Sequence, residues 1–187
     1  MPESGLVALA DKLPKPVAYV LAGGASFGAV QAGQLRALAK TDLRPDMIAG
    51  TSVGSLNGAI LAEDPDGAAD RLSAMWSTVT RDEVFGTATE AAMNFLSRKP
   101  SAIRNDGLRT LVERVLSSRD FGDLAVPFTA VATDFNTGDA VGLRSGDLVS
   151  ALLASAAIPG VFPIVEREGK SLVDGGLVAN VPLSFVH

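Results

Sequence analysis

The sequence predicts an α/β fold built around a parallel sheet. Two observations lead to this prediction: short apolar runs end in glycine turns, and each turn is followed by a segment with helical spacing. Strand, turn and helix in succession are typical of parallel sheets covered by helices. The length of 187 residues and the hydrophobic content of 47% fit a single domain over residues 1–187 with a sizeable core.

The alternation is clearest in the first third of the chain. Residues 16–24 form an apolar run that predicts a buried strand, and residues 28–40 predict the helix after it. Residues 46–50 predict a second strand, which is followed by a helix over 53–63. This second helix is rich in small residues, which permits close packing on a sheet.

The rest of the chain adds helices and strand pairs. Helices are predicted over 66–79 and 106–118, each beginning at an Asp-Gly pair that can cap a helix, whereas residues 85–105 allow no assignment. The remaining elements are a strand pair over 126–146 with its turn at Asn136-Thr137-Gly138, a helix that starts at 147 and stops before Pro159, and a hairpin around Glu168-Gly169-Lys170.

Composition argues against several classes of function. A net charge of −5 and a sequence pI of about 4.8 argue against a general nucleic-acid binder, which needs a basic face. The chain has no cysteine, which excludes a disulfide framework, a thiolate nucleophile and a cysteine-rich zinc site. We recognise no signal peptide and no apolar run long enough to span a membrane. We therefore expect a cytoplasmic protein, with peripheral membrane contact left open.

A G-x-S-x-G pattern, the nucleophile elbow of serine hydrolases, lies at Gly50-Thr51-Ser52-Val53-Gly54. The glycines are needed because a serine at such a sharp strand-to-helix turn takes a strained backbone conformation. The predicted helix starts at the serine, so the Val53 N–H can add to an oxyanion hole. The pattern is short, and a turn that merely requires glycine is the alternative.

An earlier glycine turn, Gly23–Gly28, follows a predicted strand and opens a predicted helix. Its backbone N–H groups can bind a phosphate or stabilise an oxyanion, because the positive end of the helix dipole lies behind them. The turn departs from the dinucleotide-binding pattern at Ala25. Taken alone, it is equally compatible with a purely structural role.

A serine nucleophile needs a base, and that base is usually histidine. The one histidine, His187, is the last residue, so a Ser-His-Asp triad would depend on the chain terminus. We therefore expect the base to be Asp174, which ends a predicted strand just before Gly175 and Gly176. A turn aspartate before glycines is the alternative. The serine, the glycine turn and the aspartate all lie at ends of predicted strands, where α/β folds place their sites.

Five blocks, in order, resemble the patatin-like phospholipase family over nearly the whole chain. They are YVLAGGASFGAVQAGQLRAL, IAGTSVGSLNGA, VATDFNTGDAV, ASAAIPGVFP and LVDGGLVANVP. The resemblance implies a three-layer α/β/α sandwich with a mostly parallel central sheet. It also implies hydrolysis of lipid acyl esters by a Ser-Asp dyad, without a histidine, a metal or another cofactor.

By this resemblance Ser52 is the nucleophile and Asp174 the general base. The residues implied around them are the oxyanion-hole set Gly23, Gly24, Ala25, Phe27, Gly28 and Val53, and the motif glycines Gly50, Gly54, Gly175 and Gly176. Two positions depart from the family pattern. Ala25 stands where a third glycine is usual, so it needs backbone angles that suit a Cβ. Phe27 replaces a basic residue, which weakens the case for a phosphate headgroup.

We expect a serine acyl hydrolase of the phospholipase A, lysophospholipase or lipid esterase type, acting through an acyl-enzyme. Candidate lining residues of an acyl groove are Phe27, Ile158, Val161 and Phe162, with ordinary core as the alternative. Acyl transfer on the same dyad and non-catalytic binding of an acyl lipid or a nucleotide are the competing functions. Because the chain stops soon after the last block, it is either a minimal member or a fragment. The sequence does not indicate an oligomeric state.

Overall fold

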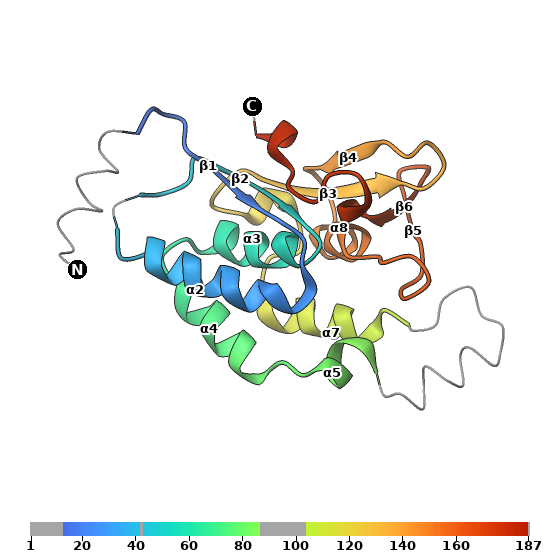
Figure 1. Cartoon of the computed structure of the whole chain (residues 1–187), viewed down its shortest axis with the longest axis horizontal. Coiled ribbons are helices and arrows are strands. Elements are labelled where there is room, and N and C mark those ends of the chain that lie inside the picture. Colours follow the sequence, from blue (N-terminus) through green and yellow to red (C-terminus); the bar gives the residue numbers. More distant parts are fainter. Residues whose placement is uncertain (1–12, 42, 87–103, 187) are drawn as a thin grey trace.

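The computed structural model describes residues 13–41, 43–86 and 104–186 (Figure 1). The strands are β1 (Ala18–Leu21), β2 (Met47–Thr51), β3 (Phe128–Asp134), β4 (Ala140–Leu143), β5 (Val165–Arg167) and β6 (Lys170–Asp174). The α-helices are α2 (Gly28–Leu38), α3 (Val53–Glu63), α4 (Ala68–Thr78), α5 (Arg81–Phe85), α7 (Asp106–Val115) and α8 (Leu148–Ser155). Short 3-10 helices are η1 (Ala25–Phe27), η2 (Phe121–Asp123), η3 (Gly175–Leu177) and η4 (Leu183–Phe185). A central sheet flanked by helices confirms the predicted α/β class.

The strands of the described residues form a six-stranded mixed sheet in the order β1-β2-β3-β6-β5, with β4 also paired to β3. The pairs β1–β2 and β2–β3 are parallel, whereas β3–β4, β3–β6 and β5–β6 are antiparallel. This differs from the mostly parallel sheet that we expected. Two of the antiparallel pairs have a local reason: the turns at Asn136-Thr137-Gly138 and Glu168-Gly169 are tight, and strands joined by tight turns run antiparallel. The third pair, β3–β6, joins the two hairpins.

The two faces of the sheet are covered differently (Figure 1). On one face, α3 packs on β1, β2 and β3, and α8 packs on β3, β5 and β6, with α2, α4 and α7 outside them. On the other face, η3 packs on β3 and the Thr51 hydroxyl donates to the Ala179 carbonyl at 2.8 Å. In the described residues this third layer consists of the segment after β6 with its short turns η3 and η4.

Small residues bring α3 close to the sheet, as its composition predicts. A Cβ at Gly54 would collide with the backbone carbonyl of Leu21, and one at Gly58 would lie 2.9 Å from the Phe128 ring. Side chains at these two positions would therefore push α3 away from β1 and β3. The close approach buries nearly the whole helix and fixes the position of its first turn.

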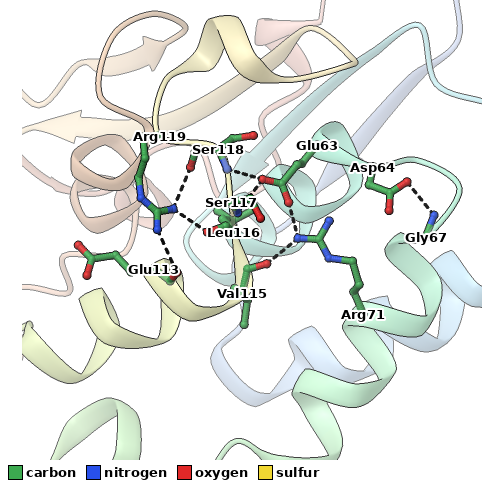
Figure 2. Close-up of polar contacts among 10 residues, drawn as sticks. All are labelled: Glu63, Asp64, Gly67, Arg71, Glu113, Val115, Leu116, Ser117, Ser118 and Arg119. Atoms are coloured by element: carbon green, nitrogen blue, oxygen red, sulfur yellow. Dashed lines mark hydrogen bonds and ion pairs between the residues drawn. The ribbon is translucent and has the colours of Figure 1, made fainter.

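The caps of α4 and α7 differ from the predicted Asp-Gly caps. The α4 helix begins at Ala68, and the Gly67 N–H before it donates to Asp64 at 3.0 Å rather than to Asp66 (Figure 2). The N-cap of α7 is Asn105, which makes no side-chain cap hydrogen bond. Asp66 lies two residues before α4, and Asp106 is itself the first residue of α7, so neither predicted aspartate occupies the N-cap position.

A polar cluster ties the end of α7 to α3 and α4 (Figure 2). Glu63, the last residue of α3, accepts hydrogen bonds from the backbone N–H groups of Ser117 at 2.9 Å and Ser118 at 2.6 Å, and it pairs with Arg71 of α4. Arg71 also donates to the Val115 carbonyl at 2.6 Å, which satisfies an acceptor at the end of α7. The cluster therefore fixes α7, which forms one wall of the cavity described below.

Candidate active site

Ser52 lies at the sharp turn between β2 and α3. Its φ of 54° and ψ of −125° form a conformation that residues other than glycine rarely adopt. The flanking glycines make the turn possible, because a Cβ at Gly50 would collide with the backbone of Gly54. The strained strand-to-helix turn expected from the G-x-S-x-G pattern is therefore observed, and the helix starts directly after the serine.

Asp174 ends β6 and is 7% exposed. Its Oδ1 accepts a hydrogen bond from the Gly176 N–H at 2.7 Å, and its carboxylate also interacts with the Ser52 side chain. Burial raises the pKa of Asp174 above its usual 3.8 and outweighs the nearby Ser52 side chain and the Gly176 N–H, which lower it. A buried carboxylate with a raised pKa is a stronger base than an exposed one, which suits it to accept a proton from a hydroxyl.

Strand register brings these two residues together across β3. Thr51 pairs with Val131 on one side of β3, and Asp174 pairs with Ala132 on the other. Neighbouring strands lie about 4.8 Å apart, so Ser52, which directly follows Thr51, is close to Asp174. Residues 122 positions apart in the chain thus meet at one level of the sheet. Both lie at strand ends as expected, but β6 is antiparallel to β3, so the register rather than a shared carboxyl edge brings Asp174 beside Ser52. His187 lies outside the described residues.

In the glycine turn after β1, Gly23–Gly28, several backbone N–H groups already have a hydrogen-bond acceptor and cannot bind an oxyanion. The Gly23 N–H donates to the Asn180 carbonyl at 3.1 Å, the Phe27 N–H to the Gly24 carbonyl at 2.9 Å, and the Gly28 N–H to carbonyls within η1. Within the described residues, the N–H groups of Gly24, Ala25 and Ser26 have no acceptor, and the same holds for Val53 at the start of α3. Of the N–H groups that we predicted for an oxyanion hole, those of Gly24, Ala25 and Val53 are therefore free, whereas those of Gly23, Phe27 and Gly28 are engaged.

Gly23 matters to this turn through its lack of a side chain rather than through its N–H group. A Cβ at Gly23 would lie 2.5 Å from Asn180 Oδ1 and 3.3 Å from Ser52 Cβ. The absence of a side chain therefore lets the turn approach Ser52 closely. Gly175, after the candidate base, is similarly constrained, because a Cβ there would collide with the Val131 carbonyl.

The two departures from the family pattern have different structural consequences. Ala25 has a φ of 47°, in the left-handed region that favours glycine, so its backbone does not suit a Cβ. The strain at such a residue is about 1–2 kcal/mol. Phe27 is 71% exposed and does not reach the cavity beside Ser52, so it is not a lining residue as we expected.

An apolar cavity of about 510 Å³ opens beside Ser52. Of the predicted lining residues, Ile158 and Phe162 line it, whereas Val161 packs against the core instead. A large part of the wall comes from α4, α5 and α7, whose contribution we did not predict. The lining residues of these three helices are Met75, Trp76, Arg81, Val84, Phe85, Leu108, Leu111 and Val112. The cavity places an apolar space next to a strained serine and a buried carboxylate.

A strained serine, a buried carboxylate and free N–H groups beside an apolar cavity are the kinds of group that a serine acyl hydrolase requires. Comparison with known proteins gives the family. The model of the family described as patatin-like phospholipase matches residues 19–187. The chain therefore belongs to the patatin-like phospholipase family, whose members form a class of lipid acyl hydrolases. This confirms the predicted family.

Relatives of similar sequence carry the same family name. The mouse (Mus musculus) Patatin-like phospholipase domain-containing protein 7 is 29% identical over 169 residues, which cover 89% of this chain and 12% of the relative. A patatin-like phospholipase domain-containing protein of Caenorhabditis elegans is 33% identical over 178 residues, which cover 91% of this chain and 12% of the relative. The chain thus spans a small part of the length of these relatives.

Solved structures support the fold. VipD from Legionella pneumophila has a TM-score of 0.58 and 16% identity, over 90% of this chain and 47% of the VipD chain. At this identity the likeness shows the fold alone.

None of the helices in the described ranges is both long and apolar enough to cross a membrane.

Proposed function

We propose that this protein is a serine acyl hydrolase that cleaves carboxylic esters of lipids through a Ser52–Asp174 dyad. One observation carries the proposal: Ser52, held at a φ of 54°, adjoins both the buried Asp174 carboxylate and an apolar cavity of about 510 Å³. Strained residues persist where the surrounding structure over-determines them, and they cluster at functional sites. The cavity suits an acyl chain, and the carboxylate suits a hydroxyl proton.

In the first half of the reaction, Ser52 Oγ bonds to the carbonyl carbon of the ester while its proton moves to the Asp174 carboxylate. The carbonyl oxygen becomes an oxyanion, which the N–H groups of Gly24, Ala25 and Val53 stabilise. The bond to the leaving alcohol then breaks, and the alcohol oxygen takes the proton from Asp174. The product of this half is an acyl-enzyme on Ser52 and a free alcohol.

In the second half, a water molecule attacks the acyl-enzyme carbonyl and gives a proton to Asp174. The same N–H groups hold the second oxyanion. The bond to Ser52 Oγ breaks, the serine recovers its proton from Asp174, and the fatty acid leaves. Asp174 is thus base and acid in turn, which a raised pKa favours because both protonation states are accessible.

Lipid substrates lie in membranes or micelles, so the protein needs a surface that can approach them. Large apolar side chains around the site are exposed, namely Phe27 of η1 at 71%, Leu177 of η3 at 59% and the neighbouring Val178 at 51%. These exposed side chains support peripheral contact with a lipid surface as part of the proposed function.

Acyl chain length is expected to control the rate. Each CH₂ that enters the cavity contributes about 0.8 kcal/mol, which corresponds to about a fourfold gain in kcat/KM per CH₂ until the cavity is full. Leu111 of α7 lines the cavity, so Leu111→Phe should lower this gain for the longer chains. Hydrolysis of a series of p-nitrophenyl esters, from short to long acyl chains, measures both effects.

The matched control is Leu35→Phe, because Leu35 is also a buried leucine on a helix but does not line the cavity. It should leave the chain-length profile unchanged. A flat profile in the parent protein, or equal profiles in the two variants, would mean that the cavity does not hold the acyl chain.

Acyl transfer to an alcohol is the second candidate, because the same acyl-enzyme can be attacked by an alcohol instead of water. A panel of lipids with added glycerol or lysolipid, read by mass spectrometry, separates the two reactions. Free fatty acid as the main product, absent in Ser52→Ala, supports hydrolysis. New esters as the main product would replace the hydrolase with a transferase, and no product from any lipid would favour a binding module.

A further inference from the structure

We propose that Ser155 is a positioning residue that, together with the Ala157 carbonyl, fixes the separation of Ser52 and Asp174. The inference rests on the proposed roles of Ser52 and Asp174 and adds a third residue to them. Ser155 lies at the end of α8, 103 positions after Ser52, and does not touch the cavity where the substrate would bind.

The Ser155 hydroxyl bridges two backbone groups of the site. Its Oγ accepts a hydrogen bond from the Ser52 N–H at 2.9 Å and donates one to the Val131 carbonyl at 2.6 Å. Ser155 is fully buried, so water does not compete for either bond. The donor and the acceptor capacity of the hydroxyl are both used by the backbone at the point where the nucleophile turn begins.

The bridge lies where the β2–β3 ladder ends. The last residue pair of this parallel ladder is Thr51 with Val131, and Ser52 then turns away from the sheet into α3. The N–H of Ser52 is therefore held to β3 through a side chain rather than directly. A strained backbone needs such a restraint, because without it the chain relaxes toward ordinary φ and ψ values.

The same short segment also holds the candidate base. The Ala157 carbonyl accepts a hydrogen bond from the Asp174 N–H at 2.9 Å. On the other side, the Thr133 hydroxyl of β3 donates to the Asp174 carbonyl at 2.9 Å. Because Ser155 and Ala157 are two residues apart in one buried turn, Ser52 and Asp174 are attached to a single rigid piece of backbone.

Loss of the hydroxyl should therefore affect the chemical step rather than substrate binding. Ser155→Ala removes the bridge and lets Ser52 move relative to Asp174 and the N–H groups of Gly24 and Ala25. A displacement of about 1 Å in an active site can cost on the order of 10²-fold in rate. We expect kcat to fall by about 10–100-fold with KM little changed on a short-chain ester, since the cavity wall is untouched.

The experiment compares Ser155→Ala with Thr41→Ala in the full chain. Thr41 is a matched control, because its buried hydroxyl also bridges two backbone groups: it donates to the Leu38 carbonyl at 2.7 Å and accepts from the Leu43 N–H at 3.2 Å. Thr41 precedes β2, at the opposite end of that strand from Ser52, and does not line the cavity. Thr41→Ala should lower the melting temperature to a similar extent and leave kcat unchanged at a temperature where both variants are folded.

The pH profile adds a readout that loss of stability alone does not move. The Ser52 side chain lowers the pKa of Asp174, so displacement of Ser52 should move the acid limb of kcat to higher pH in Ser155→Ala but not in Thr41→Ala. If Ser155→Ala does not fold, Ser155→Cys keeps a weaker bridging group and should show the same changes in smaller degree.

Two results would overturn the proposal while leaving the proposed function intact. One is an active parent protein whose Ser155→Ala variant has the same kcat and acid limb as Thr41→Ala. The other applies if Ser155→Ala does not fold: it is a Ser155→Cys variant whose kcat equals that of the parent protein. Failure of the proposed function is distinct, because the parent protein would then hydrolyse no ester.

Discussion

Replacement of Asp174 by asparagine is expected to lower kcat/KM for a short-chain ester by about 10²–10⁴-fold, the range for loss of a positioned general base. Asparagine keeps the shape of the side chain and can still accept the Gly176 N–H, but it cannot accept a proton from the Ser52 hydroxyl. Ser52→Ala should be at least as inactive. Because the two residues act as one unit, the double variant should be about as inactive as either single one.

The control for this result is His187→Ala, which should retain nearly the parent kcat/KM. Each variant is checked for folding by circular dichroism before the kinetics are measured. Multiplicative losses in the double variant would show that Ser52 and Asp174 act independently. A large loss in His187→Ala with Asp174→Asn still active would replace the dyad with a triad.

Substitution at Gly23 should have the second largest effect. Gly23→Val is expected to lower kcat by about 10²–10³-fold, the loss typical of one oxyanion donor. The side chain would be forced against Ser52 and Asn180, which moves the turn that carries the Gly24 and Ala25 N–H groups. Steady-state kinetics on a short-chain ester measure the loss.

Gly33→Val is the control for this substitution. A Cβ at Gly33, on α2, meets nothing within 4 Å, so this variant carries the same change of side chain without crowding the site. It should keep the parent kcat. Equal activity of Gly23→Val and the parent would mean that the turn after β1 is only structural.

Local sequence patterns predicted the residues at the ends of strands. G-x-S-x-G located the turn at Ser52 because its two glycines are required by close backbone contacts that no other residue allows. The bounds of α3, Val53–Glu63, followed from the same pattern. The hairpin turns at Gly138 and Gly169 were also predictable, because both glycines have positive φ.

The features that local patterns missed depend on contacts between distant segments. Ser155 reads as an ordinary small helix residue, and its role becomes visible only when α8 is placed beside the end of β2. A large part of the cavity wall comes from α4, α5 and α7, and the pattern around Ser52 does not indicate that these helices face it. The Gly23 N–H in the turn after β1 is engaged by the carbonyl of Asn180, which lies 157 residues later.

One missed element did carry a local signal. The short helix α5 begins after Thr80, whose side chain accepts a hydrogen bond from the Glu83 N–H at 3.3 Å. A threonine followed three residues later by glutamate is a recognised start signal for a helix. Its wall residues Val84 and Phe85 therefore belong to a segment that the sequence could have assigned.

The most direct test of the central claim is phosphonylation by a fluorophosphonate, followed across pH and mapped by mass spectrometry. We predict a single adduct on Ser52. Its rate should fall as the pH is lowered through the pKa of Asp174, because only the ionised carboxylate accepts the serine proton, and burial sets this pKa above 3.8. The acid limb should persist in His187→Ala and labelling should nearly vanish in Asp174→Asn. An adduct on another serine, or loss of the acid limb of the labelling rate in His187→Ala, would contradict the Ser52–Asp174 dyad.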